Sequence, residues 1–211
     1  MDCRFVKPLI SWWRRTCRER DYIWRTSRDP YRVLVAEVLL QRTRRDKVRE
    51  VYREFISKFP TVHALASAST KEVEEVTAPL GLKKRALYLI RLARSLLSKR
   101  DVMKTCRFEE LPGVGPYIAS AARVILGINT ILYPDSSIAR VLSRYFGRPL
   151  NQRRPANTTW VIETLRKCAP TDSLEKRSYF LALLDLAWEI CKPRRPLCKQ
   201  CPLAESCNNV T

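Results

Sequence analysis

The chain has 211 residues, of which 45% are hydrophobic, and a formal net charge of +19 at pH 7. This length is enough for one or two domains with a buried core. No apolar run reaches the 18 residues typical of a membrane-spanning helix, and the N-terminus lacks the apolar core and cleavage site of a secretory signal. The charge favours a polyanionic partner, nucleic acid or an acidic membrane surface, although a basic surface that binds nothing remains open at this point.

Helical periodicity runs through most of the chain. Apolar residues crowd 31–43 too densely for a surface helix, so this segment is predicted to be a core helix with two polar exceptions, Glu37 and Gln41. Further helices are predicted at 47–59, 71–76, 83–99, 116–127, 136–147, 157–169 and 175–191. Apart from the short stretch NTILYP (129–134) there is no alternating strand pattern, and the predicted fold class is all-α.

The turn before one of these helices has the sequence LPGVGPYIAS (111–120). Gly113 and Gly115 allow a tight turn and a close approach of the backbone to a ligand, and Pro116 suits the first position of a helix. Exposed N–H groups beside a helix N-terminus attract phosphate. A GVG turn by itself is more often a plain helical hairpin, but the basic charge of the chain strengthens the phosphate-binding interpretation.

Four of the eight cysteines lie close together near the C-terminus, with the spacing C-x6-C-x2-C-x5-C: Cys191, Cys198, Cys201 and Cys207. The other four are scattered. Because no export signal is present, we expect no disulfide framework and favour a metal site. Four thiolates this close bind a soft metal or an iron–sulfur cluster. The spacing does not separate the two, although zinc sites usually contain two C-x2-C units and this segment has one.

Three stretches together resemble the helix-hairpin-helix DNA glycosylases of the endonuclease III superfamily: LPGVGPYIASAARVILG, PDSSIARVLSRYFG and the four-cysteine tail. DYIWRTSRDPYRVLVAEVLLQRT (21–43) is similar to the N-terminal part of two branches, the adenine-mismatch glycosylase MutY and the archaeal thymine/uracil mismatch glycosylase Mig. The resemblance covers nearly the whole chain. It implies a six-helix domain at 25–134, which contains the helix-hairpin-helix, and a discontinuous domain formed by 1–24 and 135–211.

This resemblance also implies what the chain binds. Double-stranded DNA containing a mismatch would lie in the groove between the two domains of a monomer. The hairpin, Pro112 to Gly115 with Val114 between the glycines, would hold backbone phosphates. The four tail cysteines would carry a [4Fe–4S] cluster that orders a basic loop and takes no part in the base chemistry. The implied location is intracellular, in a prokaryote and by analogy an archaeon.

Enzymes of this family turn the target nucleotide out of the DNA stack, and something must fill the gap. Gln41 matches a wedge position of the family, and Leu82 is a candidate for a second wedge, although a leucine after a glycine turn is as often a core residue. Arg42 replaces a glutamine of the adenine branch. It is a candidate to donate to the orphaned guanine, or equally to contact a phosphate.

Two carboxylates are candidates for the chemistry. Asp135 matches the family aspartate that stabilises the oxocarbenium-like sugar, and its other expected role is the N-cap of the helix that follows. Pro134 stands where the family usually has an aliphatic residue. Glu37 lies on a predicted core helix, and burial disfavours its charged form, which suits a general acid. A buried glutamate paired with an arginine is the alternative.

Tyr117 occupies the position where endonuclease III has the lysine that forms a Schiff base. A phenol forms no imine, so the resemblance implies a monofunctional glycosylase. The adenine branch has serine at this position and the thymine branch has tyrosine, which favours a substrate of thymine or uracil opposite guanine. The alternatives are an adenine glycosylase that lacks the C-terminal domain of its branch, and a non-catalytic iron–sulfur DNA-binding module.

Overall fold

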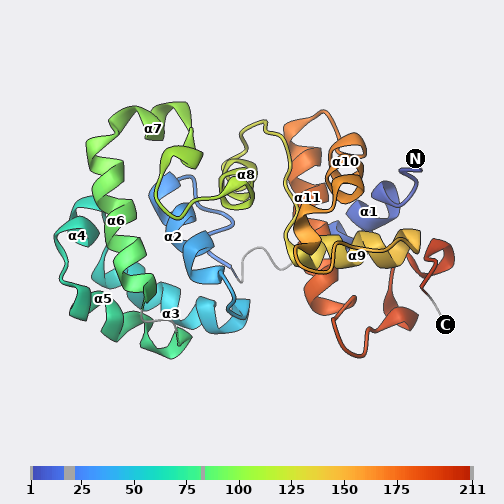
Figure 1. Cartoon of the computed structure of the whole chain (residues 1–211), viewed down its shortest axis with the longest axis horizontal. Helices are drawn as coiled ribbons and strands as arrows, with labels where there is room; N and C mark the ends of the chain where they lie inside the picture. The colour runs from blue at the N-terminus through green and yellow to red at the C-terminus, as the bar shows by residue number, and fades with distance from the viewer. Residues whose placement is uncertain (1, 17–21, 82–83, 210–211) are drawn as a thin grey trace. The chain divides into compact units, whose positions relative to one another are not determined.

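The computed structural model describes residues 2–16, 22–81 and 84–209, and every regular element in these ranges is helical. The all-α fold class is therefore confirmed. The chain divides into two compact units, Glu19–Leu126 and the pair Met1–Arg18 with Gly127–Thr211, and Figure 1 labels their helices. The boundaries between the units follow residues 18 and 126. The domain boundaries expected from the sequence follow residues 24 and 134. Within the described ranges, no helix has both the length and the apolar character needed to cross a bilayer.

The unit Glu19–Leu126 is built around α2 (Pro30–Leu40). From Tyr31 to Leu39 every residue except Arg32 is buried, because α3, α6 and α8 all pack against this helix. A helix covered on all sides needs apolar residues all round, which explains its dense apolar pattern. The other helices of this unit in the described ranges are α3 (Arg45–Lys58), α4 (Val62–Ser67), α5 (Thr70–Thr77), α6 (Lys84–Ser98), α7 (Arg100–Thr105) and α8 (Pro116–Ile125).

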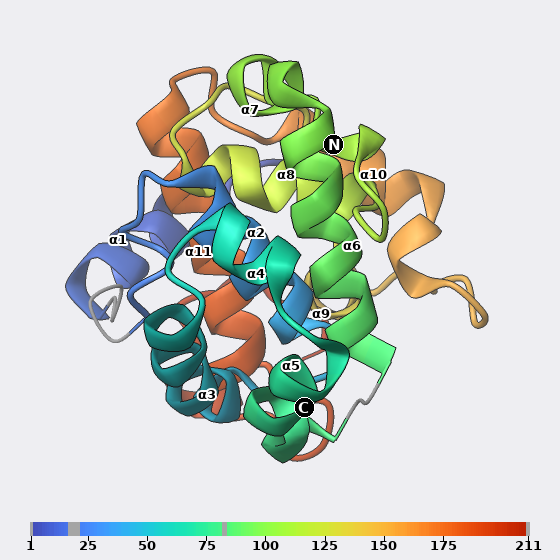
Figure 2. The ribbon, with the colours of Figure 1, turned by 90° about the vertical axis from the view of Figure 1, so that its left-hand side faces the viewer.

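Hydrogen bonds fix the ends of this core. Asp29 caps α2 by accepting a bond from the backbone N–H of Tyr31 (2.9 Å), and the Tyr31 hydroxyl donates to the carbonyl of Phe59 (2.7 Å) at the end of α3. Figure 2 shows α6 running beside α4, with which it packs. These contacts join α2, α3, α4 and α6 into one core from which α8 and the turn before it are positioned.

The second unit contains α1 (Val6–Thr16), α9 (Ser136–Phe146), α10 (Thr159–Lys167) and α11 (Ser173–Glu189). α11 is its central helix: residues 178–187 are all buried, and α1 and α9 pack against it. A buried carboxylate lies in this contact, where Asp185 on α11 accepts a hydrogen bond from the indole N–H of Trp13 on α1 (2.8 Å). Buried polar groups require such partners.

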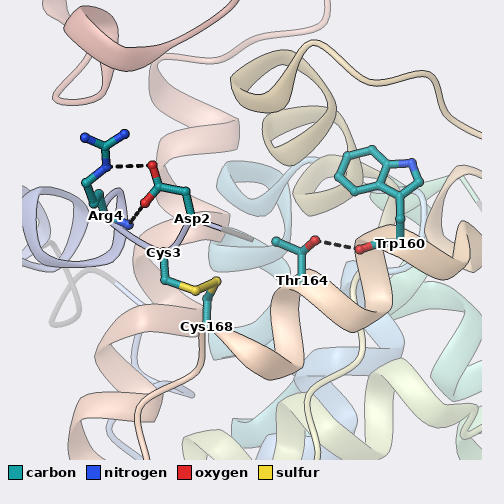
Figure 3. Close-up of a disulfide and its surroundings, with 6 residues drawn as sticks. All are labelled: Asp2, Cys3, Arg4, Trp160, Thr164 and Cys168. Atoms are coloured by element: carbon teal, nitrogen blue, oxygen red, sulfur yellow. Dashed lines mark hydrogen bonds and ion pairs between the residues drawn. A yellow bond between two sulfur atoms is a disulfide. The ribbon is translucent and has the colours of Figure 1, made fainter.

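A disulfide joins Cys3, just before α1, to Cys168 at the end of α10, with a Cα–Cα distance of 5.3 Å (Figure 3). The sequence predicts no disulfide framework and does not indicate this bond. The two cysteines are 165 residues apart in the sequence, and nothing in their spacing marked them as partners. Intracellular disulfides are rare in most organisms but common in hyperthermophiles.

Two features of the helices differ from the sequence-based expectations. α2 ends at Leu40, so Gln41 is the exposed C-cap residue and not part of the core helix. The six-residue helices α4 and α7 were not expected. They cover too few turns for a periodic pattern to be visible.

Candidate active site

The turn before α8 is held by its two apolar residues and open at its two glycines. Leu111 and Val114 are buried and joined by a backbone hydrogen bond (3.2 Å), while Gly113 and Gly115 are exposed. Gly113 has φ +77, which a side chain would strain. Gly115 has an ordinary φ, and a Cβ added there would meet nothing within 4 Å. The backbone of Gly115 is therefore open to a ligand at the N-terminus of α8.

The loop after α2 lies against this hairpin. The side-chain amide of Gln41 donates to the carbonyl of Gly113 at the limit of hydrogen-bond distance (3.5 Å), which brings these two predicted DNA-binding residues together. Arg42 is exposed, with φ +54, an uncommon backbone conformation for a residue with a side chain. Leu82, the second predicted wedge, lies outside the described residues.

Glu37 and Tyr117 both belong to the core of the unit Glu19–Leu126. Glu37 is buried on α2, with 6% of its surface exposed, as its position in a core helix predicted. Tyr117 is the second residue of α8 and packs half-buried against the hydrophobic core. The two helices that carry these side chains pack against each other.

Asp135 belongs to the other unit, where it caps the N-terminus of α9. Its Oδ1 accepts the backbone N–H groups of Ser137 (2.9 Å) and Ile138 (2.8 Å), and the Ser137 hydroxyl lies 2.7 Å from both carboxylate oxygens. The predicted cap is thus present. Pro134 before it is buried, and Asp135 itself is half-buried with an extended backbone. A carboxylate held this firmly is preorganised to stabilise a cation without rearranging.

Two arginines of α9 fasten the cysteine tail. Arg140 donates to the carbonyl of Ala187, in the last turn of α11, and to the carbonyl of Cys191, two residues beyond the end of this helix (both 2.9 Å). Arg144 donates to the carbonyls of Lys192 (2.7 Å) and Pro193 (2.9 Å) and lies 3.5 Å from the Cys191 sulfur. The helix that Asp135 caps is therefore the same helix that holds the start of the tail.

The four tail cysteines are half-buried and free of disulfide bonds. Burial, with a smaller contribution from the neighbouring cysteines Cys191, Cys207 and Cys198, raises the pKa of the Cys201 thiol to about 11. Within the described residues, no three His, Cys, Asp or Glu side chains are arranged as a site for a metal ion. By its chemistry alone, a set of four thiols suits a thiolate-bound cluster.

Sequence reasoning missed Arg85, which lies on α6 near the hairpin and the Gln41 loop. Only 4% of its surface is exposed, and its guanidinium donates to the residues around Gln41. In a sequence, a buried arginine on an otherwise apolar helix face shows only as an interruption in the spacing of apolar residues. A cavity of about 480 Å³ elsewhere in this unit contains none of the predicted site residues; it is lined by Asp29, Tyr31, Pro60, Thr61, Val62, His63, Leu96, Leu97 and Met103.

A turn with two exposed glycines joins the short 3-10 helix Phe108–Glu110 to α8, and this is the arrangement of a helix-hairpin-helix motif. The family model described as HhH-GPD superfamily base excision DNA repair protein matches residues 35–159, and the chain belongs to this superfamily.

Individual proteins within this superfamily are similar to the chain to different extents. The chain is 36% identical over 205 residues to a thymine-DNA glycosylase of Aeropyrum pernix, which covers 95% of this chain and 92% of that protein. It is 33% identical to a thymine/uracil-DNA glycosylase of Pyrobaculum aerophilum, over 98% and 90% of the two chains. The human adenine DNA glycosylase is 32% identical, but the chain spans only 39% of its length.

A solved structure shows the same likeness in three dimensions. The structure of a thermostable thymine-DNA glycosylase superposes with a TM-score of 0.80 at 28% identity, over 98% of this chain and 94% of that chain. The likeness in fold extends over both units.

Proposed function

We propose that this chain is a monofunctional DNA glycosylase that removes thymine or uracil opposite guanine. The observation that carries the proposal is Tyr117, a half-buried phenol at the start of the helix after the glycine turn. A phenol at this position supplies no amine for a Schiff base. The full-length likeness to thymine/uracil-DNA glycosylases supports the choice of base.

The reaction breaks the bond between C1′ of the sugar and the base nitrogen. As this bond lengthens, positive charge develops on the sugar and negative charge on the departing base. Asp135, as a carboxylate, stabilises the sugar cation until a water molecule adds to C1′ and releases its extra proton to solvent. The base leaves with a proton from solvent or from Glu37. The product is an intact strand with an abasic site.

The enzyme reaches its target by turning the nucleotide out of the duplex. The turn Pro112–Gly115 holds the phosphate backbone through the N–H groups of its two exposed residues, Gly113 and Gly115. The charge of +19 favours DNA in general. Gln41 enters the gap in the stack, and Arg42 contacts the guanine left without a partner.

The tail cysteines Cys191, Cys198, Cys201 and Cys207 hold a [4Fe–4S] cluster. When bound, the cluster supplies a rigid anchor for the basic segment around Lys192 and Arg194, which then faces DNA phosphates. This proposal is tested on protein purified without oxygen. It should be brown, with broad absorption near about 400 nm, and Cys198→Ser should lose the colour together with DNA affinity. Colourless protein with one bound zinc would contradict it.

The adenine glycosylase remains the second candidate, because the human adenine enzyme matches 96% of this chain and Glu37 is buried as a general acid requires. A non-catalytic module is disfavoured by the firmly held carboxylate of Asp135.

Product analysis tests the monofunctional reaction. The wild-type protein is incubated with a labelled G·U duplex and the products are resolved with and without hot alkali. Strands that break only after alkali, and no protein–DNA adduct after borohydride, are the expected result. Efficient borohydride trapping would mean that a lysine acts as nucleophile, and the monofunctional assignment would fail.

A further inference from the structure

Arg85 is a buried charge without a role in the reaction described so far. It lies in the first turn of α6, with 4% of its surface exposed, and burial lowers the pKa of its guanidinium. A buried arginine stays charged and is costly unless its donors are satisfied. Its position therefore requires an explanation in terms of what the guanidinium holds.

The guanidinium holds the loop that follows α2. Nη1 donates to the carbonyl of Leu39 (2.9 Å) and to the hydroxyl of Thr43 (3.0 Å), and Nη2 donates to the carbonyl of Gln41. The two carbonyls, of Leu39 and Gln41, lie at the end of α2, where carbonyl groups have no partner within the helix. One planar side chain thus binds both ends of the short loop Gln41–Thr43.

The loop needs such a support. Arg42, between the bound residues, has φ +54, a conformation that costs a non-glycine residue about 1 kcal/mol or more. The Gln41 side chain donates a long hydrogen bond of 3.5 Å to the Gly113 carbonyl of the hairpin, which holds it weakly. Without Arg85 the backbone of Gln41 and Arg42 would relax toward ordinary conformations, and both side chains would change direction.

The same helix also contacts the hairpin. Tyr88, one turn after Arg85 on α6, is 47% exposed, and its ring carbon Cδ1 would lie 3.8 Å from a Cβ on Gly113. Residues three apart on a helix share one face. The start of α6 therefore touches both the Gln41–Thr43 loop and the phosphate-binding turn.

We propose that Arg85 is a positioning residue that holds the Gln41–Thr43 loop in the conformation needed to fill the gap left by the flipped nucleotide. This inference rests on the proposed role of Gln41 as the wedge. Arg85 touches neither the base nor the sugar, and it acts through the backbone of the loop. Its removal should slow nucleotide flipping more than it weakens binding to DNA, because the hairpin and the basic surface are unchanged.

The test compares Arg85→Lys with Arg94→Lys. Lysine keeps the charge but lacks the fork that spans three acceptors. Arg94 lies nine residues further along the same helix, and its Nε donates to the carbonyl of Ala66 (3.1 Å), away from the loop. Base release from a G·U duplex is measured with enzyme in excess, the dissociation constant by fluorescence anisotropy, and flipping by the emission of 2-aminopurine beside the target.

We expect Arg85→Lys to lose about tenfold to a hundredfold in the rate of base release, the scale on which a small misplacement of a catalytic arrangement acts. Its dissociation constant should stay within about threefold of wild type, because phosphate contacts dominate affinity, and its 2-aminopurine signal should fall. Arg94→Lys should match wild type in all three. Equal rates for the two variants, or a loss in Arg85→Lys only of affinity, would overturn the proposal.

A double-mutant cycle with Gln41→Ala distinguishes the wedge role of Gln41 from the positioning role of Arg85. If Gln41 is the wedge and Arg85 acts through it, Arg85→Lys should cause little further loss of rate in the Gln41→Ala background. If Gln41→Ala itself keeps the wild-type rate, the wedge assignment fails. If Gln41→Ala is slow and the effect of Arg85→Lys adds in full, the wedge stands and the role of Arg85 is refuted.

Discussion

Replacing Asp135 by asparagine should separate its two roles, helix cap and catalytic carboxylate. Asparagine caps a helix about as well as aspartate, and its Oδ1 can still accept the two backbone N–H groups of Ser137 and Ile138. The loss in folding stability is then limited to the charge–dipole contribution, about 0.3–1 kcal/mol. Base release should fall on the order of a hundredfold to a thousandfold, or about 2.7–4 kcal/mol, as for other single preorganised electrostatic groups.

Asp172→Asn is the matched control. Asp172 caps α11 in the same way, accepting the N–H groups of Leu174 and Glu175 (both 2.9 Å), and it has no proposed contact with DNA. Both variants should unfold within about 1 kcal/mol of wild type in urea. Only Asp135→Asn should lose base release, measured under single-turnover conditions on a G·U duplex, and its affinity for that duplex should be kept or increased because a negative charge near phosphate is gone.

The result that refutes this reasoning is an Asp135→Asn protein that releases the base at nearly the wild-type rate. A second contrary result is an equal loss of rate in Asp172→Asn, since both effects would then reflect helix capping and not the charge beside the sugar.

Three other predictions concern the hairpin, the nucleophile position and the disulfide. Gly115→Ala should fold normally but bind duplex DNA at least about tenfold more weakly, since its Cβ would stand in the open space offered to phosphate; Gly113→Ala, at φ +77, should also lose about 1 kcal/mol of unfolding free energy in urea. Tyr117→Lys should gain strand cleavage and borohydride trapping on DNA, with a weaker preference for thymine over uracil, and no trapping at all would place Tyr117 away from the sugar. Cys168→Ser should lower the unfolding free energy by about 2–4 kcal/mol, because the bond to Cys3 closes a long loop. An unfolding free energy equal to that of the oxidised wild-type protein would contradict this.

Most of the fold could be predicted from the sequence, because the spacing of apolar residues in a long helix reflects which of its sides are buried. α2 is buried all round and its apolar residues are dense; α3 and α6 have one covered side and show a stripe. The hairpin could be predicted from its own residues, because the backbone of Gly113 has φ +77 and glycine is the residue that adopts this conformation without strain. The cap at Asp135 could be predicted because aspartate is a favoured N-cap residue and an amphipathic run follows it directly.

What the sequence did not reveal depends on contacts between distant residues. The pairing of Cys3 with Cys168 and the hold of Arg140 on the end of α11 join segments that only the tertiary fold brings together. The contacts of Arg85 are of the same kind. Two of its acceptors are the backbone carbonyls of Leu39 and Gln41, which residue types in a sequence do not reveal.

The most direct test of the account is a set of single-turnover rates of base release on otherwise identical duplexes that contain G·T, G·U, A·G, A·8-oxoguanine or an oxidised pyrimidine. The account predicts release of thymine and uracil opposite guanine, little or no release of adenine, and abasic strands that break only in alkali. Faster release of adenine than of thymine or uracil would contradict it and assign the chain to the adenine glycosylases, and no release from any duplex would mean that the protein is not a glycosylase.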